Sequence, residues 1–114
     1  MEYSCVFCKI QIGDVPSDLV YSDEMFFVIR DINPVAPTHL LVIPQQHVTE
    51  LGGLKTLNRD SFTDMIEVAN YVAAKEGIIE SGFRLVINQG QNSGQEVEHL
   101  HMHVLGGHRL GTIG

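Results

Sequence analysis

The sequence contains few basic residues. Seven lysines and arginines stand against 14 aspartates and glutamates, which leaves a formal net charge of −7. A protein that binds nucleic acid neutralises the phosphate backbone with lysine and arginine, so this balance argues against such a partner. A single small phosphate is still compatible with an acidic chain, because backbone N–H groups and imidazoles bind it at contact range. We therefore expect a small-molecule ligand and no nucleic acid.

Long apolar runs are also absent. No segment approaches the roughly 20 apolar residues of a membrane-spanning helix, and the mean hydropathy is only +0.07. The opening residues Met-Glu-Tyr-Ser-Cys lack the positive start and the apolar stretch of a secretory signal. We expect a cytoplasmic protein with no membrane partner. A length of 114 residues suits a single domain, residues 1–114, with its own core.

Cysteine is scarce, and the two cysteines, Cys5 and Cys8, belong to one Cys-x-x-Cys element. In a reducing compartment this spacing indicates metal or redox chemistry before a structural disulfide. Two thiolates do not complete a tetrahedral zinc site. A metal ion would need two more ligands, for which histidine is the natural candidate.

The apolar pattern predicts an α+β fold with a five-stranded, mainly antiparallel sheet. Strands are predicted over 19–21, 25–30, 39–43, 83–88 and 98–105. A short helical turn over 5–12 precedes them, and apolar residues three and four apart predict a long amphipathic helix over 60–76. Its small Ala69 and Ala73 would allow close packing against a partner or against the chain's own sheet.

The last predicted strand carries His99, His101 and His103 in strict alternation with apolar residues. Because side chains alternate across a strand, the histidines share one face and the apolar residues the other. A single histidine on a strand is more often structural. Burying three imidazoles without ligands would leave ring nitrogens unpaired, so the pattern favours a functional role.

This segment, His-Leu-His-Met-His-Val-Leu over 99–105, resembles the His-φ-His-φ-His-φ-φ motif of the histidine triad (HIT) superfamily. Upstream, Asp-Ile-Asn-Pro-Val-Ala-Pro-Thr-His over 31–39 and Leu-Val-Ile-Pro over 41–44 are similar to the Hint branch. The similarity spans roughly residues 5–108. It implies a HIT-like fold and a homodimer. Glu96, which stands where eukaryotic members place a hydroxyl residue, resembles the bacterial members, and the Cys-x-x-Cys element resembles the zinc-binding variant.

Members of this branch are nucleotide hydrolases and transferases that cleave purine nucleoside phosphoramidates and related 5′-phosphate derivatives. The resemblance implies a purine nucleoside monophosphate or its derivative as ligand, with His101 as the nucleophile that forms a nucleotidyl-histidine intermediate. Imidazole ordinarily titrates near pH 6.5, so much of it is unprotonated at neutral pH. The resemblance gives His103 a phosphate contact, whereas His99 and His39 support the triad.

The same resemblance supplies the nucleotide contacts. Asp31 corresponds to the acceptor of the ribose hydroxyls. The residues that would sandwich the base are Val6, Phe7, Ile10, Ile29 and Ile32. Those that would surround the phosphate are Asn88, Gly94, Gln95, Glu96, Val97, His101 and His103. By periodicity alone the apolar members would be assigned to the core. A carboxylate at Glu96 would repel a phosphate unless it is protonated or turned away, so no leaving-group role is carried over.

Related proteins hold zinc with a Cys-x-x-Cys element, a distal histidine and the first triad histidine. The corresponding residues here are Cys5, Cys8, His47 and His99. A Cys₂His₂ set closes the tetrahedron, which indicates a structural zinc ion. His108 matches no ligand or catalytic position, and we expect it at the surface.

Two alternative functions stay open. A nucleotidyl transferase or dinucleoside polyphosphate hydrolase would use the same adduct on His101 and differ only in acceptor and leaving group. A zinc-stabilised nucleotide-binding or scaffold protein would bind nucleotide tightly with negligible turnover.

Overall fold

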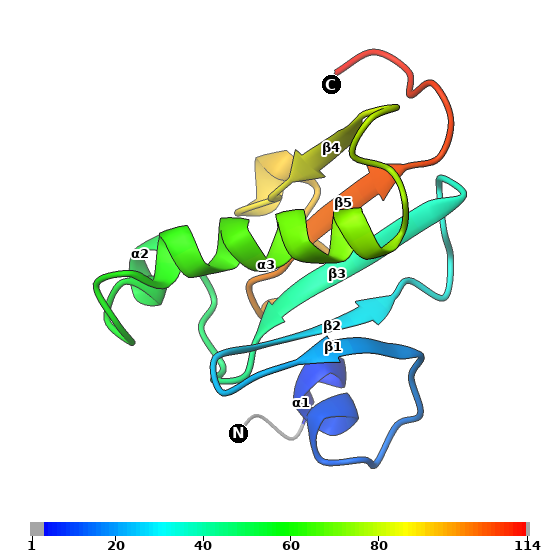
Figure 1. Cartoon of the computed structure of the whole chain (residues 1–114). Coiled ribbons are helices and arrows are strands. Elements are labelled where there is room, and N and C mark those ends of the chain that lie inside the picture. The colour runs from blue at the N-terminus through cyan, green and yellow to red at the C-terminus, as the bar shows by residue number, and fades with distance from the viewer. Residues whose placement is uncertain (1–3, 114) are drawn as a thin grey trace.

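The computed structural model describes residues 4–113, and its centre is one five-stranded antiparallel sheet (Figure 1). Its strands are β1 (Leu19–Ser22), β2 (Phe26–Arg30), β3 (Thr38–Pro44), β4 (Phe83–Val86) and β5 (Met102–Gly106). Their spatial order is β1-β2-β3-β5-β4, and every neighbouring pair is antiparallel. The last strand in sequence therefore lies between β3 and β4.

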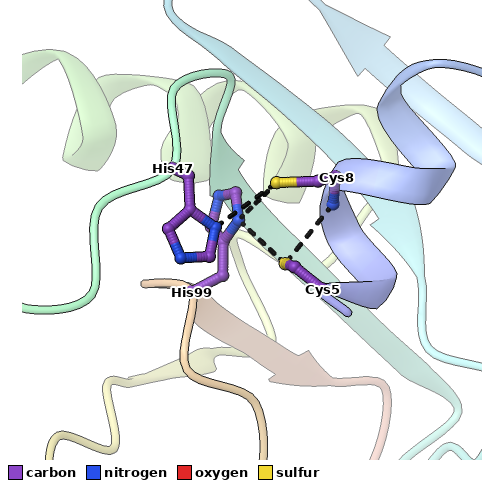
Figure 2. A group of neighbouring side chains, drawn as sticks. All are labelled: Cys5, Cys8, His47 and His99. Atoms are coloured by element: carbon purple, nitrogen blue, oxygen red, sulfur yellow. Dashed lines mark hydrogen bonds between the residues drawn. The ribbon is translucent and has the colours of Figure 1, made fainter. Parts of the chain in front are cut away.

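Helix α1 (Val6–Gln11) packs on one face of the sheet. It presents Phe7 and Cys8 to a small core of side chains that alternate along β2 and β3, namely Phe27, Ile29, Leu41 and Ile43. Cys5, the N-cap of α1, and Cys8 point toward His99, just before β5 (Figure 2). In the β3–β5 ladder Leu41 is opposite His103, so the histidines lie on this face.

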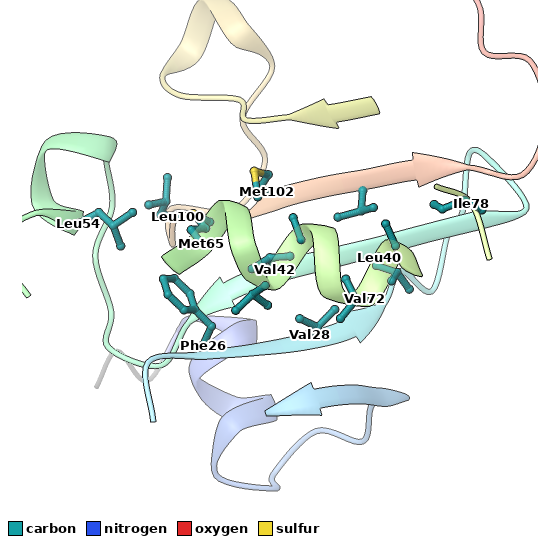
Figure 3. Packing of buried hydrophobic residues seen from close by; sticks show 14 of the residues in the cluster. Phe26, Val28, Leu40, Val42, Leu54, Met65, Val72, Ile78, Leu100 and Met102 are labelled. Carbon is teal, nitrogen blue, oxygen red and sulfur yellow. The ribbon is translucent and has the colours of Figure 1, made fainter. Parts of the chain in front are cut away.

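Helix α3 (Ser61–Lys75) covers the other face (Figure 3). The intervening residues of the strands pack beneath it, chiefly Phe26, Val28, Leu40, Val42, Met102 and Val104. Ala69 and Ala73 are fully buried in this cluster, so their small side chains bring the helix close to the chain's own sheet. Both faces of β2 and β3 are thus covered, which explains why their apolar runs are almost continuous.

An ion pair joins the end of β2 to the end of α3. The Arg30 guanidinium donates to both carboxylate oxygens of Glu76, at 2.6 and 2.8 Å, and lies 3.3 Å from Asp18. This bidentate contact lowers the pKa of Glu76. It holds the strand end from which the chain turns into Asp31.

The predicted elements agree with the structure to within one residue at each end, except at the last two strands. β4 ends at Val86, two residues before the predicted end at 88. β5 begins at Met102, not at residue 98. Residues before Met102 do not pair with β3, because the Leu100 N–H donates to Val48 O at 2.7 Å and His99 Nε2 donates to Pro44 O. The prediction of strand over 98–101 was wrong, yet Leu100 still enters the α3 core.

Two short helical segments were not predicted from the sequence. Helix α2 (Leu51–Leu54) reads Leu-Gly-Gly-Leu and has no side-chain cap. The 3₁₀ turn η1 (Gln91–Ser93) lies within the segment predicted as a polar loop. Within residues 4–113, none of the helices has the length and apolar character needed to cross a membrane.

Gly106, at the end of β5, provides a test of how closely β5 and the segment after α3 approach. A methyl group there would lie 2.8 Å from Ile78 Cδ1 and 3.3 Å from Gly82 O. We expect Gly106→Ala to lower the free energy of unfolding by about 1–3 kcal/mol, because Ile78 is itself buried. Urea denaturation measures this. Gly111→Ala, whose methyl group meets nothing within 4 Å, is the matched control; equal stability of the two variants would contradict the prediction.

Candidate active site and metal centre

Four side chains from distant parts of the chain converge beside α1 (Figure 2). Cys5 Sγ lies 3.3 Å from His99 Nδ1, and Cys8 Sγ lies 3.3 Å from His47 Nδ1 and 3.7 Å from His99 Nδ1. In a tetrahedral zinc site, sulfur and nitrogen ligands are separated by about 3.6 Å. The four ligand atoms all lie within 4.8 Å of one another, so their spacing fits a zinc ion.

The chemistry of these ligands also fits zinc. The His99 ring donates from Nε2 to Pro44 O at 2.9 Å, which leaves the lone pair on Nδ1, the atom that faces the thiols. Burial lowers the pKa of His99 to about 4, so the ring is neutral at pH 7. Burial also raises the pKa of the Cys5 thiol, and a bound metal cation would reverse that effect. The sequence prediction of this ligand set agrees with the geometry.

His99 also contacts the central histidine through its backbone. The His101 ring donates from Nδ1 to His99 O at 2.8 Å, which leaves the lone pair on Nε2. The Phe7 ring meets both imidazoles edge-on, with centroid distances of 5.7 Å to His99 and 5.0 Å to His101. His101 is only 7% exposed, yet it borders two cavities. The orientation of the His101 ring is thus fixed by hydrogen bonding and packing.

A second pair of rings lies beside the triad. His39 Nε2 is 2.9 Å from His103 Nδ1 and 3.4 Å from Asp31 Oδ2, and His39 Nδ1 accepts the Val35 N–H at 3.1 Å. Burial lowers the pKa of His103 to about 4, with a smaller effect from neighbouring His101, and it lowers the pKa of His39 as well. Burial thus favours the neutral form of both rings.

One cavity, of about 210 Å³, is mainly apolar. It lies between α1 and the sheet, and all five residues predicted to sandwich the base line it. Asp31 stands at its border together with His101 and His103. Leu41 and the Val15-Pro16-Ser17 segment also line it and were not predicted. Leu41 could have been found, because it alternates with His39 along β3; the loop residues carry no signal.

The second cavity, of about 540 Å³, is more polar and shares Asp31, Glu96, His101 and His103 with the first. Its remaining lining includes Asn88, Gly94 and Gln95, which were predicted to lie around the phosphate, and also Asn33, Val35, His39, Val86 and Leu105. All thirteen residues predicted to contact nucleotide thus border one of two adjoining cavities. His108 is exposed and borders neither of them.

The loop between β4 and the triad is held by its own side chains. Asn88 Nδ2 donates to Ser93 O at 2.7 Å, and the Gly90 N–H donates to Gln95 Oε1 at 2.8 Å. Gly94 has a φ of +80°, and a methyl group there would meet nothing within 4 Å. Its left-handed backbone thus suits glycine and leaves room for a ligand. Asn88 and Gln95 therefore shape the cavity wall, a role that the sequence did not indicate.

The family model of the HIT domain matches residues 13–110. The chain belongs to the HIT family. A purine nucleoside phosphoramidase of Escherichia coli strain K12 is 42% identical over 113 residues, which are 99% of this chain and 95% of that protein. Similarity to HIT proteins therefore extends over almost the whole chain.

Solved structures of HIT proteins have the same fold. A HIT family hydrolase from Clostridium thermocellum superposes with a TM-score of 0.92 at 42% identity, covering 99% of this chain and 98% of that one. A zinc-bound histidine triad family protein from Mycobacterium smegmatis gives a TM-score of 0.79 at 36% identity, covering 90% of this chain and 74% of that one. The predicted α+β, HIT-like fold is confirmed.

The metal centre generates a direct prediction. Cys8→Ser removes one of the four ligands, so we expect zinc content to fall well below one per chain. The free energy of unfolding should fall by roughly 3 kcal/mol or more, because metal binding contributes to folding. Elemental analysis and urea denaturation measure the two effects. His108→Ala, which removes an exposed histidine, should change neither; retention of full zinc by Cys8→Ser would remove this cysteine from the ligand set.

Proposed function

We propose that this chain is a nucleotide hydrolase that cleaves purine nucleoside phosphoramidates or related nucleoside 5′-phosphate derivatives. The observation that carries the proposal is the orientation of His101. Its Nδ1–H donates to His99 O, so the lone pair lies on Nε2, and the ring borders both cavities. The E. coli relative, whose name is purine nucleoside phosphoramidase, supports this substrate class.

In the first step, His101 Nε2 attacks the α-phosphorus of a nucleotide whose base occupies the apolar cavity. A bond forms between phosphorus and Nε2, and the bond from phosphorus to the leaving nitrogen or oxygen breaks. The leaving group takes up a proton from solvent water, and the water that attacks in the second step returns one proton to solvent. The positive charge on the modified imidazole is stabilised by the hydrogen bond from Nδ1 to His99 O.

In the second step, water attacks the same phosphorus and the bond to Nε2 breaks. The products are a nucleoside monophosphate and the original neutral imidazole. Negative charge grows on the phosphoryl oxygens in both steps, so donors must already surround them. We assign this role to His103 and to backbone N–H groups near Gly94, which border the polar cavity. Asp31, at the junction of the cavities, would accept the ribose hydroxyls.

We assign zinc a structural role at Cys5, Cys8, His47 and His99. Because these residues close the coordination shell, the metal has no position left for substrate. It would fix His99, whose carbonyl orients His101. Glu96 borders both cavities but is exposed, so its carboxylate is free to turn toward solvent and the mechanism does not require it.

The proposal is tested with adenosine 5′-phosphoramidate as substrate and AMP release as readout. The parent protein should release AMP, and His101→Ala should lower kcat at least 1,000-fold, an order-of-magnitude estimate for loss of a nucleophile. His108→Ala, the matched histidine control, should retain parental activity, and zinc content is kept equal in all three proteins. Equal AMP release by His101→Ala and the parent would refute the nucleophile assignment. Tight AMP binding without turnover in the parent would instead favour a binding protein.

We also propose that the chain forms a homodimer. Phe62 and Ile66 lie one turn apart on α3 and are 40% and 50% exposed. They flank the buried stripe of α3 on the side away from Glu67 and Tyr71, which border the β1–β2 hairpin. That side leads toward β4, an outer strand that pairs within residues 4–113 only with β5. An apolar helix flank beside an open strand edge suits a second copy.

Light scattering at micromolar concentration should give twice the chain mass for the parent. Ile66→Glu should shift the protein toward monomer, because a charge would be buried at the interface. Ile113→Glu introduces the same charge at an exposed site in the C-terminal tail and should leave the dimer intact. A monomeric parent would eliminate the proposal.

A further inference from the structure

His39 uses both of its ring nitrogens within the described structure. Nδ1 accepts the Val35 backbone N–H at 3.1 Å, and Nε2 lies 2.9 Å from His103 Nδ1. A neutral imidazole has one N–H and one lone pair. Because an amide N–H always donates, His39 Nδ1 must hold the lone pair. The His39 proton therefore lies on Nε2.

The same reasoning applies to the ring of His103. His39 Nε2–H donates to His103 Nδ1, so that atom must hold the His103 lone pair. The His103 proton is then on Nε2, the nitrogen that does not face His39. His103 borders both cavities, and a donor rather than an acceptor is the group that a phosphoryl oxygen requires.

We infer that Val35 is a positioning residue for phosphoryl transfer, acting through its backbone N–H to set the tautomers of His39 and His103. As a consequence, His103 presents an N–H to the phosphoryl oxygens. This role in transfer rests on the proposed function, whereas the tautomers themselves do not. The Val35 side chain is 70% exposed, which is consistent with a contribution from the main chain.

The loop that carries this amide is held in place. The Asp31 N–H donates to His39 O at 2.9 Å, and Asp31 Oδ1 accepts the Asn33 N–H at 2.8 Å. Pro34 and Pro37 flank Val35 and restrict the backbone further. Neither proline has an N–H, so Val35 is one of only two positions between 34 and 37 that could donate to His39.

A divalent cation is the competing explanation for this cluster, because ligand atoms of Asp31, His39 and His103 lie within 4.8 Å of one another. Such an ion would need lone pairs on both His39 Nε2 and His103 Nδ1. The Val35 N–H already occupies the single lone pair of neutral His39. A cation would therefore break that hydrogen bond, whereas the tautomer chain satisfies every contact. Asp31 Oδ2 lies 3.4 Å from His39 Nε2.

Long-range ¹H–¹⁵N correlation spectra of ¹⁵N-histidine-labelled, zinc-loaded protein at pH 7.5 report which ring nitrogen carries each proton. Without substrate, we expect protons on Nε2 of His39 and His103. Val35→Pro removes the N–H and should shift both rings to mixed tautomers, whereas Val35→Ala retains the N–H and should keep the parental pattern. A parental spectrum with the His103 proton on Nδ1 overturns the inference whether or not the proline variant folds. Equal spectra for the two variants also overturn it.

Turnover of adenosine 5′-phosphoramidate provides the second readout. We expect Val35→Pro to lower kcat about 10-fold, the equivalent of one misdirected hydrogen bond, with KM changed less than about 2-fold. Unchanged kcat with altered tautomers would overturn the role in transfer. Absence of AMP release in every protein would overturn it together with the proposed function, while the spectra would still show whether Val35 sets the tautomers.

Discussion

Each neutral imidazole has one donor and one acceptor, and the site depends on how the backbone assigns them. Pro44 O fixes the proton of His99 on Nε2, whereas His99 O fixes that of His101 on Nδ1. Two histidines that are two residues apart thus adopt opposite tautomers. One turns its lone pair toward the thiols, and the other belongs to a residue that borders both cavities. Burial keeps His99 and His103 neutral at pH 7, which makes this assignment possible.

The positions of these rings depend on the two helices that cover opposite faces of the sheet. α3 covers one face with a large apolar core, and the smaller α1 covers only part of the other. The remainder of that second face is left for the cavities, and Phe7 belongs both to the wall of the apolar cavity and to the smaller core. α1 also brings Cys5 and Cys8 to His99. The same six-residue helix therefore supplies core, ligand and pocket residues.

Periodicity was sufficient to predict α3 and the first three strands, because their apolar spacing reflects which face is buried. The family resemblance identified thirteen of the residues that line the two cavities but not the others, such as Leu41 and Val15. The start of β5 could not be predicted, because it is set by contacts of His99 with Pro44 and of Leu100 with Val48 that are remote in sequence. The contribution of Val35 was also beyond sequence reasoning. Every residue except proline has a backbone N–H, so the identity of the side chain at position 35 does not indicate this role.

The strand order β1-β2-β3-β5-β4 has a consequence for the order in which the protein assembles. β1, β2 and β3 are joined by neighbours in sequence and can pair as soon as they are synthesised. Within residues 4–113, β4 pairs only with β5, so it joins the sheet only through the last strand. The contact between Cys5 and His99 spans 94 positions. The metal centre therefore requires the two ends of the chain to meet, at an entropic cost that grows with the length of the closed loop.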